Sequence, residues 1–311
     1  MTVLICGSMA YDHIMVFPDE FKNHILPEKV HILNVSFLVP EMRREFGGCA
    51  GNIAYNMNLL EPGLGLPMAT VGKDFEPYQA WMDENKVGRC YIKSIEEEFT
   101  AQAFITTDLS DNQITAFHPG AMNESHQNNI NDVDGCKLGI ISPDGRDGML
   151  QHATQFAEAG IPFIFDPGQG MPMFNGDELV DFIEKATWLT VNDYEWQLMQ
   201  ERTSLNEKQI SERLQALIIT RGGEGSVIHA SGKTYEIPSA SPESISDPTG
   251  CGDAYRAGLL YGLTHEMDWE TTGRIASLMG AIKIEQHGTQ NHSFTLDEFK
   301  DRYKNEFGSS F

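Results

Sequence analysis

A run of small residues between two aspartates, SDPTGCGDAYRAGLL (residues 246–260), is the part of the sequence best suited to chemistry. The apolar residues behind it have helical spacing, so we expect a helix to begin near Gly250. The first N–H groups of a helix lack internal partners and lie at the positive end of its dipole, and glycine lets an anion approach them closely. The first turn, formed by Gly250, Cys251, Gly252 and Asp253, is therefore a candidate phosphate or oxyanion pocket.

Asp253 has two interpretations. An aspartate suits the first turn of any helix because of the dipole. Beside a bound phosphoryl group, the same carboxylate could act as a general base that accepts the proton of an attacking hydroxyl. The chain has no GxxxxGK[ST] loop, no HExxH or GxSxG motif, and no GxGxxG after its first apolar strand. These absences argue against a P-loop enzyme, a zinc peptidase, an α/β-hydrolase and a dinucleotide-dependent dehydrogenase.

The composition argues against some classes of binding partner. The 311 residues include 45 acidic and 22 basic side chains, which give a formal net charge of −23. This charge argues against a general attraction to nucleic acid polymers or anionic membranes, although a local cluster of N–H groups can still hold a small anion. Five widely spaced cysteines without a CxxC pair favour a reducing cytoplasm over a disulfide framework or a zinc site. The sequence has no signal-peptide pattern and no apolar run long enough for a membrane span, so we expect a cytoplasmic protein.

The strands and helices that must position the turn at Gly250–Asp253 alternate along the chain. After residue 135, apolar strand candidates alternate with helical stretches, which predicts βαβ units and a parallel sheet. The strand candidates are 137–142, 161–168, 187–192 and 216–223, and the helices lie near 148–159, 177–185, 193–200 and 207–215. Further predictions are strands at 3–8 and 68–72, strand-like pieces in 30–39, hairpins over 100–117 and around 231–232, and helices at 51–60, 250–264, 268–286 and 296–306.

Four motifs occur in an order that resembles one known family. DPTGCGDAYRAG (247–258) is similar to the C-terminal signature D-T-x-G-A-G-D of the ribokinase family, also called the PfkB carbohydrate kinase family, from which it departs at Pro248 and Cys251. FGGCAGNIAYN and the residues after it (46–74) resemble the family's N-terminal signature. NDYE (192–195) matches its N-x-x-E motif, and TRGGEGS (220–226) matches its nucleotide loop.

The resemblance implies a three-layer ribokinase-like α/β fold with a mainly parallel sheet and a small β-rich lid. We place the kinase core at 1–12, 46–89 and 121–311, and the lid at 13–45 and 90–120. The resemblance also implies an ATP-dependent kinase with Asp253 as its base and the turn Gly250, Cys251 and Gly252 as its anion hole. Such a lid would close over the substrate and exclude water.

The remaining roles are also implied by the resemblance. Asn192 and Glu195 would organise Mg²⁺ and the phosphates of ATP, partly through water. Thr220, Gly222, Gly225 and Gly288 would contact the nucleotide, with Thr289 a weaker candidate, and Asp247 and Thr249 would contribute to a monovalent-cation site, such as K⁺. Asp12, Gly47, Gly48 and Asn52 would contact the substrate. Taken alone, Asp12 also suits a turn at a strand end, and Asn52 a helix N-cap.

The sequence defines less sharply which molecule would accept the phosphoryl group. Cys251 and the stretch QITAFHPGAM (113–122) resemble adenosine-kinase-like, prokaryotic nucleoside kinases, which favours adenosine or a related nucleoside. Phe104 and Phe117 could stack on its base, although aromatic side chains in a hairpin more often serve packing. Arg256 could touch phosphate or substrate, or be solvated.

Other functions stay open. A sugar kinase for ribose, fructose or a sugar phosphate is the nearest alternative. A catalytically silent nucleoside-binding protein is a further one, against which the intact Asp253, Asn192 and Glu195 argue. The family resemblance also allows a homodimer formed through the lid.

Overall fold

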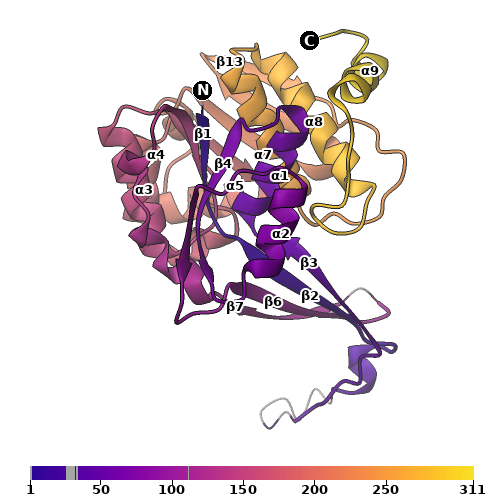
Figure 1. Ribbon diagram of the computed structural model, residues 1–311. Coiled ribbons are helices and arrows are strands. Elements are labelled where there is room, and N and C mark those ends of the chain that lie inside the picture. Colours follow the sequence, from indigo (N-terminus) through magenta and orange to yellow (C-terminus); the bar gives the residue numbers. More distant parts are fainter. Residues whose placement is uncertain (1, 26–31, 33, 111) are drawn as a thin grey trace.

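A nine-stranded, mainly parallel sheet forms the centre of the computed structural model (Figure 1), which describes residues 2–25, 32, 34–110 and 112–311. Its order is β13-β12-β11-β10-β9-β8-β1-β4-β5. The strands are β1 (Thr2–Cys6), β4 (Gly65–Gly72), β5 (Tyr91–Ile95), β8 (Cys136–Ile141), β9 (Phe163–Phe165), β10 (Trp188–Asn192), β11 (Ala216–Thr220), β12 (Ser226–Ala230) and β13 (Lys233–Ile237). All pairs from β5 to β11 are parallel, and β11, β12 and β13 pair antiparallel at one edge.

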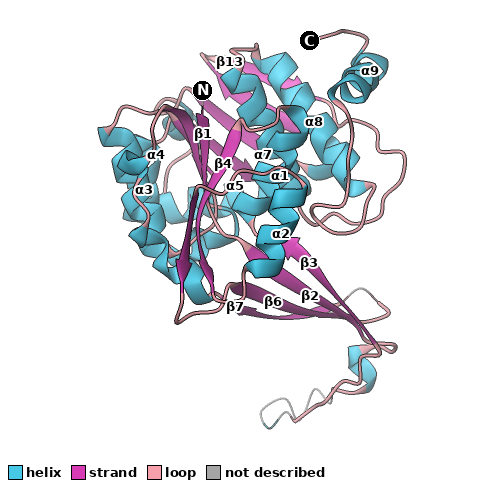
Figure 2. Ribbon diagram, viewed as in Figure 1, coloured by secondary structure: helices cyan, strands magenta, loops and turns pink. Residues whose placement is uncertain are grey.

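Helices cover both faces of this sheet and make three layers (Figure 2). One face packs against α1 (Cys49–Leu60), α2 (Glu76–Glu84), α7 (Cys251–Thr264), α8 (Trp269–Ile284) and α9 (Leu296–Phe307). The other packs against α3 (Arg146–Glu158), α4 (Gly176–Lys185), α5 (Asp193–Thr203) and α6 (Glu207–Ser211). Because strand side chains alternate between faces, Leu4 of β1 lies in one core and Ile5 in the other. The predicted α/β fold class is confirmed.

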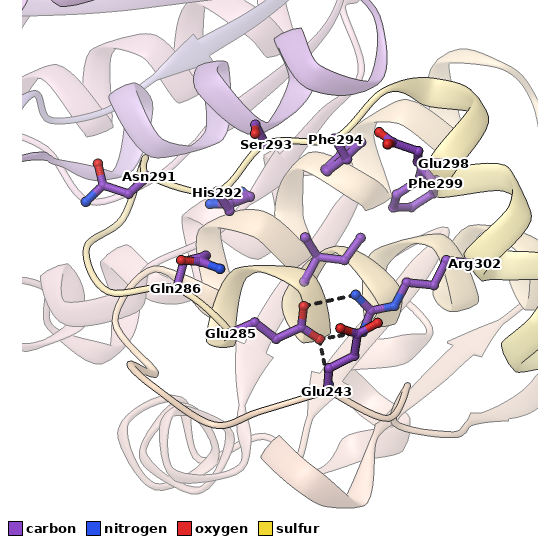
Figure 3. Close-up of a pocket in the computed structure, with 11 residues that line it drawn as sticks. Glu243, Glu285, Gln286, Asn291, His292, Ser293, Phe294, Glu298, Phe299 and Arg302 are labelled. Carbon is purple, nitrogen blue, oxygen red and sulfur yellow. Dashed lines mark hydrogen bonds and ion pairs between the residues drawn. The ribbon is translucent and has the colours of Figure 1, made fainter.

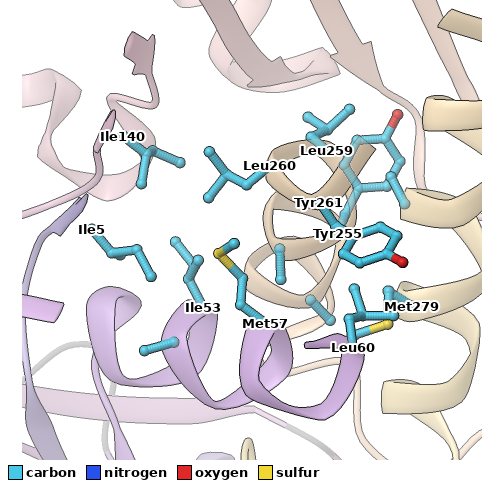
Figure 4. Close-up of a cluster of buried hydrophobic side chains, with 14 of the residues drawn as sticks. Ile5, Ile53, Met57, Leu60, Ile140, Tyr255, Leu259, Leu260, Tyr261 and Met279 are labelled. Atoms are coloured by element: carbon cyan, nitrogen blue, oxygen red, sulfur yellow. The ribbon is translucent and has the colours of Figure 1, made fainter. Parts of the chain in front are cut away.

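The helix that carries Asp253 is held by the larger core (Figure 4). Met57 of α1, Leu260 of α7 and Met279 of α8 belong to this core, together with Ile5 of β1. A Cβ added at Gly258 would lie 2.5 Å from the Cα of Ala276, so α7 and α8 approach closely only because this residue has no side chain. This packing fixes the direction of α7 and thus the place of its first turn.

A second, four-stranded sheet extends away from the main body (Figure 1) in the order β3-β2-β6-β7. Its strands are β2 (Ala10–Val16), β3 (Glu41–Gly47), β6 (Ala101–Thr107) and β7 (Gln113–His118). Only the β2–β6 pair is parallel. The antiparallel β6–β7 pair confirms the predicted hairpin, and the β12–β13 pair confirms the one around 231–232.

Several local predictions differ from the structure. The strand-like pieces of 30–39 form no strand over 34–39, while 30, 31 and 33 lie outside the described residues, and the strand of this region is β3 instead. Helix α2 and the start of β2 at Ala10 were not predicted. Strand β5, which lies within the expected lid segment 90–120, pairs with β4 in the large sheet. Whether a segment forms a strand here depends on its pairing with distant segments, and the local sequence pattern contains little information about that pairing.

Short 3₁₀ turns connect several elements: η1 (Phe21–Asn23), η3 (Gly120–Gln127), η4 (Ile130–Asp132), η5 (Gly168–Met173) and η6 (Gly222–Glu224). Over the described ranges, we find no helix with the length and apolar character needed to cross a membrane.

Candidate active site

The first turn of α7 has unpaired backbone donors. Gly250 caps the helix with φ of 81°, a left-handed conformation that favours glycine. The amide of Cys251 donates to the carbonyl of Pro248 at 3.2 Å. Within the described part of the chain, the amides of Gly250, Gly252 and Asp253 have no acceptor. These groups lie at the positive end of the helix dipole, so the turn can hold an anion as the sequence predicts.

A chain of side chains holds the Asp253 carboxylate in place. The amide nitrogen of Asn52, on α1, donates to Oδ2 of Asp253 at 2.7 Å. The side-chain oxygen of Asn52 accepts from Gln290 at 3.0 Å, and Gln290 also donates to the Tyr78 hydroxyl at 2.6 Å. Asn52 is buried in α1, whose N-cap is Gly48, so Asn52 is not a helix cap. It contacts the carboxylate from the opposite helix.

Two carboxylates in this region have raised pKa values. Burial raises the pKa of Asp253 to about 6, against which the Asn52 hydrogen bond and the Arg256 charge act. Burial also raises the pKa of Asp12 to about 6, and the charges of Glu45 and Asp247 add to the shift. A carboxylate with such a pKa is ionised at neutral pH and still basic enough to accept a proton.

Arg256 is neither solvated nor free. Its Nε and Nη2 donate to the two carboxylate oxygens of Asp166 at 3.0 and 2.9 Å, and its Nη1 donates to the Gly252 carbonyl at 3.3 Å. Both partners are buried, with 6% and 3% of their surface exposed. Sequence reasoning left Arg256 open and missed Asp166, whose only local signal is its position directly after a buried strand.

Asp166 belongs to a row of polar residues at the carboxyl ends of neighbouring parallel strands. Asp166 follows β9, Asn192 ends β10 and Thr220 ends β11, and Asn192 and Thr220 are register partners. The carboxyl ends of parallel strands are the usual ligand side of such a sheet. Beyond Thr220, Gly222 and Gly225 have φ of 55° and 88°, so their loop turns back sharply over these strand ends. The structure thus places Asn192, Thr220, Gly222 and Gly225 at the same end of the sheet.

Asn192 and Glu195 form a capping box at the start of α5. The Asn192 side chain accepts from the Glu195 amide at 2.7 Å, and Glu195 Oε2 accepts from the Asn192 amide at 2.8 Å. Burial raises the pKa of Glu195, with a further contribution from Asp166. No group of three or more His, Cys, Asp or Glu side chains that could hold a metal occurs among the described residues. One carboxylate, together with substrate phosphates and water, is a donor set that suits Mg²⁺.

The predicted substrate residues lie where the small sheet meets α1. A Cβ at Gly47 would lie 2.5 Å from Oδ2 of Asp12, so the carboxylate sits directly over this glycine. Gly48 has φ of 86°, and a Cβ there would lie 2.6 Å from Ala10 N, Met9 Cα and the Ser8 carbonyl. Gly48 therefore serves the close approach of α1 to this segment.

Strand register separates the two candidate aromatics. Asp12, Ala103 and Phe117 are successive register partners across β2, β6 and β7, so their side chains share one face. Phe104 is one residue further along and lies on the opposite face, where its ring stacks on His13 at 4.7 Å. Phe117 therefore shares a face with Asp12, whereas Phe104 does not.

The expected cation residues join the loop before α7 to the loop that follows α8. The Asp247 carboxylate accepts from the amides of Thr249 at 2.9 Å and Gly288 at 3.0 Å. Although burial acts to raise it, these hydrogen bonds leave the pKa of Asp247 below its usual range. The Thr289 hydroxyl donates to the carbonyl of Phe46. Gly288 and Thr289 thus lie beside the anion turn.

A separate hollow lies between the end of α8 and α9 (Figure 3). Glu243, Glu285 and Arg302 line it, and Arg302 binds Glu285 at 3.0 Å. Its lining includes neither Asp253 nor the polar residues Asp166, Asn192 and Thr220. The hollow is therefore distinct from the site described above.

Comparison with known proteins shows the family of this chain. The profile described as pfkB family carbohydrate kinase matches residues 8–295. A nucleoside kinase of Methanocaldococcus jannaschii is 31% identical over 278 residues, which are 88% of this chain and 91% of that protein. A nucleoside kinase of Burkholderia thailandensis, solved in complex with inosine, is 51% identical, with a TM-score of 0.91 and 99% of each chain covered. Its structure with ADP-inosine has 52% identity and a TM-score of 0.88, and covers 99% of this chain and 97% of that one.

The fold and these matches identify the chain as a phosphotransferase. The chain belongs to the pfkB family of carbohydrate kinases. Within that family it lies in the branch of ATP-dependent nucleoside kinases.

Proposed function

We propose that this enzyme transfers the γ-phosphoryl group of ATP to the 5′-hydroxyl of adenosine or a related nucleoside such as inosine. The observation that carries the proposal is the Asp253 carboxylate, held by Asn52 at 2.7 Å beside unpaired backbone donors. The name of the Burkholderia relative and its complexes with inosine and ADP-inosine support a nucleoside as the acceptor.

In the proposed reaction Asp253 accepts the proton of the 5′-hydroxyl. The bond from that oxygen to the γ-phosphorus forms while the bond from phosphorus to the bridging oxygen breaks, and ADP leaves. The first-turn amides of α7 would stabilise the negative charge on the transferring group. Mg²⁺ held near Glu195 and Asn192 would neutralise phosphate charge when bound. The loop with Thr220, Gly222 and Gly225 would border the nucleotide.

The acceptor would lie on the Asp12 face of the small sheet. A carboxylate accepts hydrogen bonds from two neighbouring hydroxyls, so Asp12 would hold the ribose. Ile14 and Ile105 share this face with Phe117 and Asp12, because they lie two residues from Asp12 and Ala103 along their strands. This apolar surface next to Asp12 would receive the base, which a free sugar lacks.

The test is ATP consumption by the purified protein with adenosine, inosine, guanosine, cytidine, ribose, fructose and fructose 6-phosphate. We expect nucleosides to be turned over far better than sugars and ³¹P NMR to identify a 5′-monophosphate. A sugar that reacts far better than every nucleoside would make the protein a sugar kinase. Binding of nucleosides without turnover would make it a silent binding protein.

We further propose that two copies pair through the small sheet. Its face opposite Asp12 carries Met42, Phe104 and Ile114, which are 66%, 40% and 44% exposed. Burying such an apolar face is favourable in water. Ile114→Lys should convert a dimer to a monomer in sedimentation equilibrium, whereas Ile245→Lys, at an isoleucine exposed elsewhere, should not. A wild-type protein that is monomeric at all concentrations would refute the pairing.

A further inference from the structure

Lys283, on α8, is completely buried. Its ammonium donates to the carbonyl oxygen of Asp247 at 2.8 Å and to that of Gln286 at 3.1 Å. A lysine is almost never fully buried unless its charge is paired, because removing the charge from water is costly. The burial of the Lys283 ammonium therefore needs a physical reason, and the two carbonyl groups that it binds indicate what that reason is.

The two carbonyls belong to the two loops that meet at the anion turn, one before α7 and one after α8. Asp247 begins the turn that ends at Gly250, and Gln286 precedes Gly288, whose amide binds the Asp247 carboxylate at 3.0 Å. A Cβ at Gly250 would lie 3.1 Å from the side chain of Thr289, so the same two loops also meet there. Lys283 and Asp247 thus join these loops from within the protein.

This place does not fit a resident monovalent cation. Such an ion replaces its water with oxygen ligands, commonly backbone carbonyls. Here the Lys283 ammonium already occupies the carbonyls of Asp247 and Gln286, and both Asp247 carboxylate oxygens accept backbone amides. The ammonium carries the same single positive charge and only donates hydrogen bonds, so it meets the same need.

We propose that the Lys283 ammonium is the built-in cation of the anion turn and that the enzyme therefore works without K⁺. The inference rests on the proposed kinase function, because it assigns Lys283 the task of holding the phosphoryl-binding turn in shape. Lys283 is a positioning residue, since it acts through the turn. Its charge also reaches the turn itself: burial raises the pKa of Cys251 to about 11, and Lys283 opposes that rise.

The experiment compares the wild type with Lys283→Ala, which opens space for an ion, and with Lys283→Met, which fills the space without a charge. Activity and melting temperature are measured in choline chloride and in KCl at equal ionic strength. Wild-type activity should be the same in both salts. Lys283→Ala should lose activity by about 10- to 100-fold in choline, as expected for a displaced site, and KCl should restore much of it. KCl should also raise the melting temperature of Lys283→Ala, but not that of the wild type or Lys283→Met.

Lys300→Ala, at an exposed lysine of α9, serves as the control and should respond to neither salt. Wild-type activity that needs KCl would overturn the proposal, even if both Lys283 variants fail to fold. So would a Lys283→Ala variant as active and stable as the wild type, or one on which KCl has no effect. The melting temperature needs no turnover, so a protein that shows the expected K⁺ response and phosphorylates no nucleoside would keep this inference and refute the proposed function.

Discussion

Asn52 and Asp253 are 201 residues apart in the chain and joined by a hydrogen bond of 2.7 Å. The bond links the first turn of α7 to the buried side of α1. Because Asn52 is itself held by Gln290, the carboxylate faces the anion turn in a defined orientation.

Replacement of Asp253 by asparagine should abolish proton acceptance and keep the shape of the site. We expect kcat to fall by about 10²- to 10⁴-fold, the usual contribution of a general base, while ATP binding measured by calorimetry persists. Asp297→Asn, in the first turn of α9, is the matched control and should retain full activity. Near-normal turnover of the Asp253 variant would reject the base assignment.

Asp253→Asn should also stabilise the fold at neutral pH. The pKa of Asp253 is raised from 3.8 to about 6, so the folded state disfavours the ionised form. Stability is therefore lost as pH rises through this window, and the asparagine avoids that loss. The variant should melt at a higher temperature than the wild type above pH 6, and the difference should shrink toward pH 4. A difference that persists below pH 4 would point to another cause.

The pH profile of kcat/KM should show an acid limb near pH 6, because Asp253 of the free enzyme must be ionised to accept a proton. The Asn52 hydrogen bond lowers the pKa of Asp253, so Asn52→Ala should move this limb to higher pH. Asn58→Ala, on the same helix but bound to the Asn85 carbonyl, should leave it in place. A limb that does not move in the Asn52 variant would show that the hydrogen bond does not tune the base.

Breaking the buried Arg256–Asp166 pair should destabilise the protein strongly. Arg256→Met alone leaves the Asp166 carboxylate buried without its partner, which typically costs about 3–5 kcal/mol in the free energy of unfolding. The double variant Asp166→Leu/Arg256→Met should lose less than the sum of the two single losses, as measured in urea. Arg89→Met, which breaks an exposed pair with Asp83, should cost about 0–1 kcal/mol. If the loss of the double variant equals the sum of the two single losses, Asp166 and Arg256 are not coupled.

Gly250→Ala should separate the conformational cost of the anion turn from its role in activity. Its φ of 81° costs an alanine about 1–2 kcal/mol, and the same cost applies to Gly160→Ala at φ of 65° in open space. Only the Gly250 variant also presses on Thr289, so it alone should lower kcat/KM for ATP, by about 10- to 100-fold. Equal activity of the two variants would show that the turn tolerates displacement.

The sequence by itself determined the local parts of this protein. The first turn of α7, the capping box of Asn192 and Glu195, and the alternation of strands and helices depend on neighbouring residues, so their chemistry is visible in short motifs. The order of four motifs also indicated the family, which the comparisons confirm.

Only the tertiary structure decided which distant groups meet. The bonds from Asn52 to Asp253 and from Arg256 to Asp166, and the burial of Lys283 against Asp247, join segments with no common local pattern. Strand register decided that Phe117 shares the face of Asp12 and Phe104 does not, because a shift of one residue reverses the face. Such contacts depend on how helices pack and strands pair across the whole chain, and a linear pattern does not encode that arrangement directly.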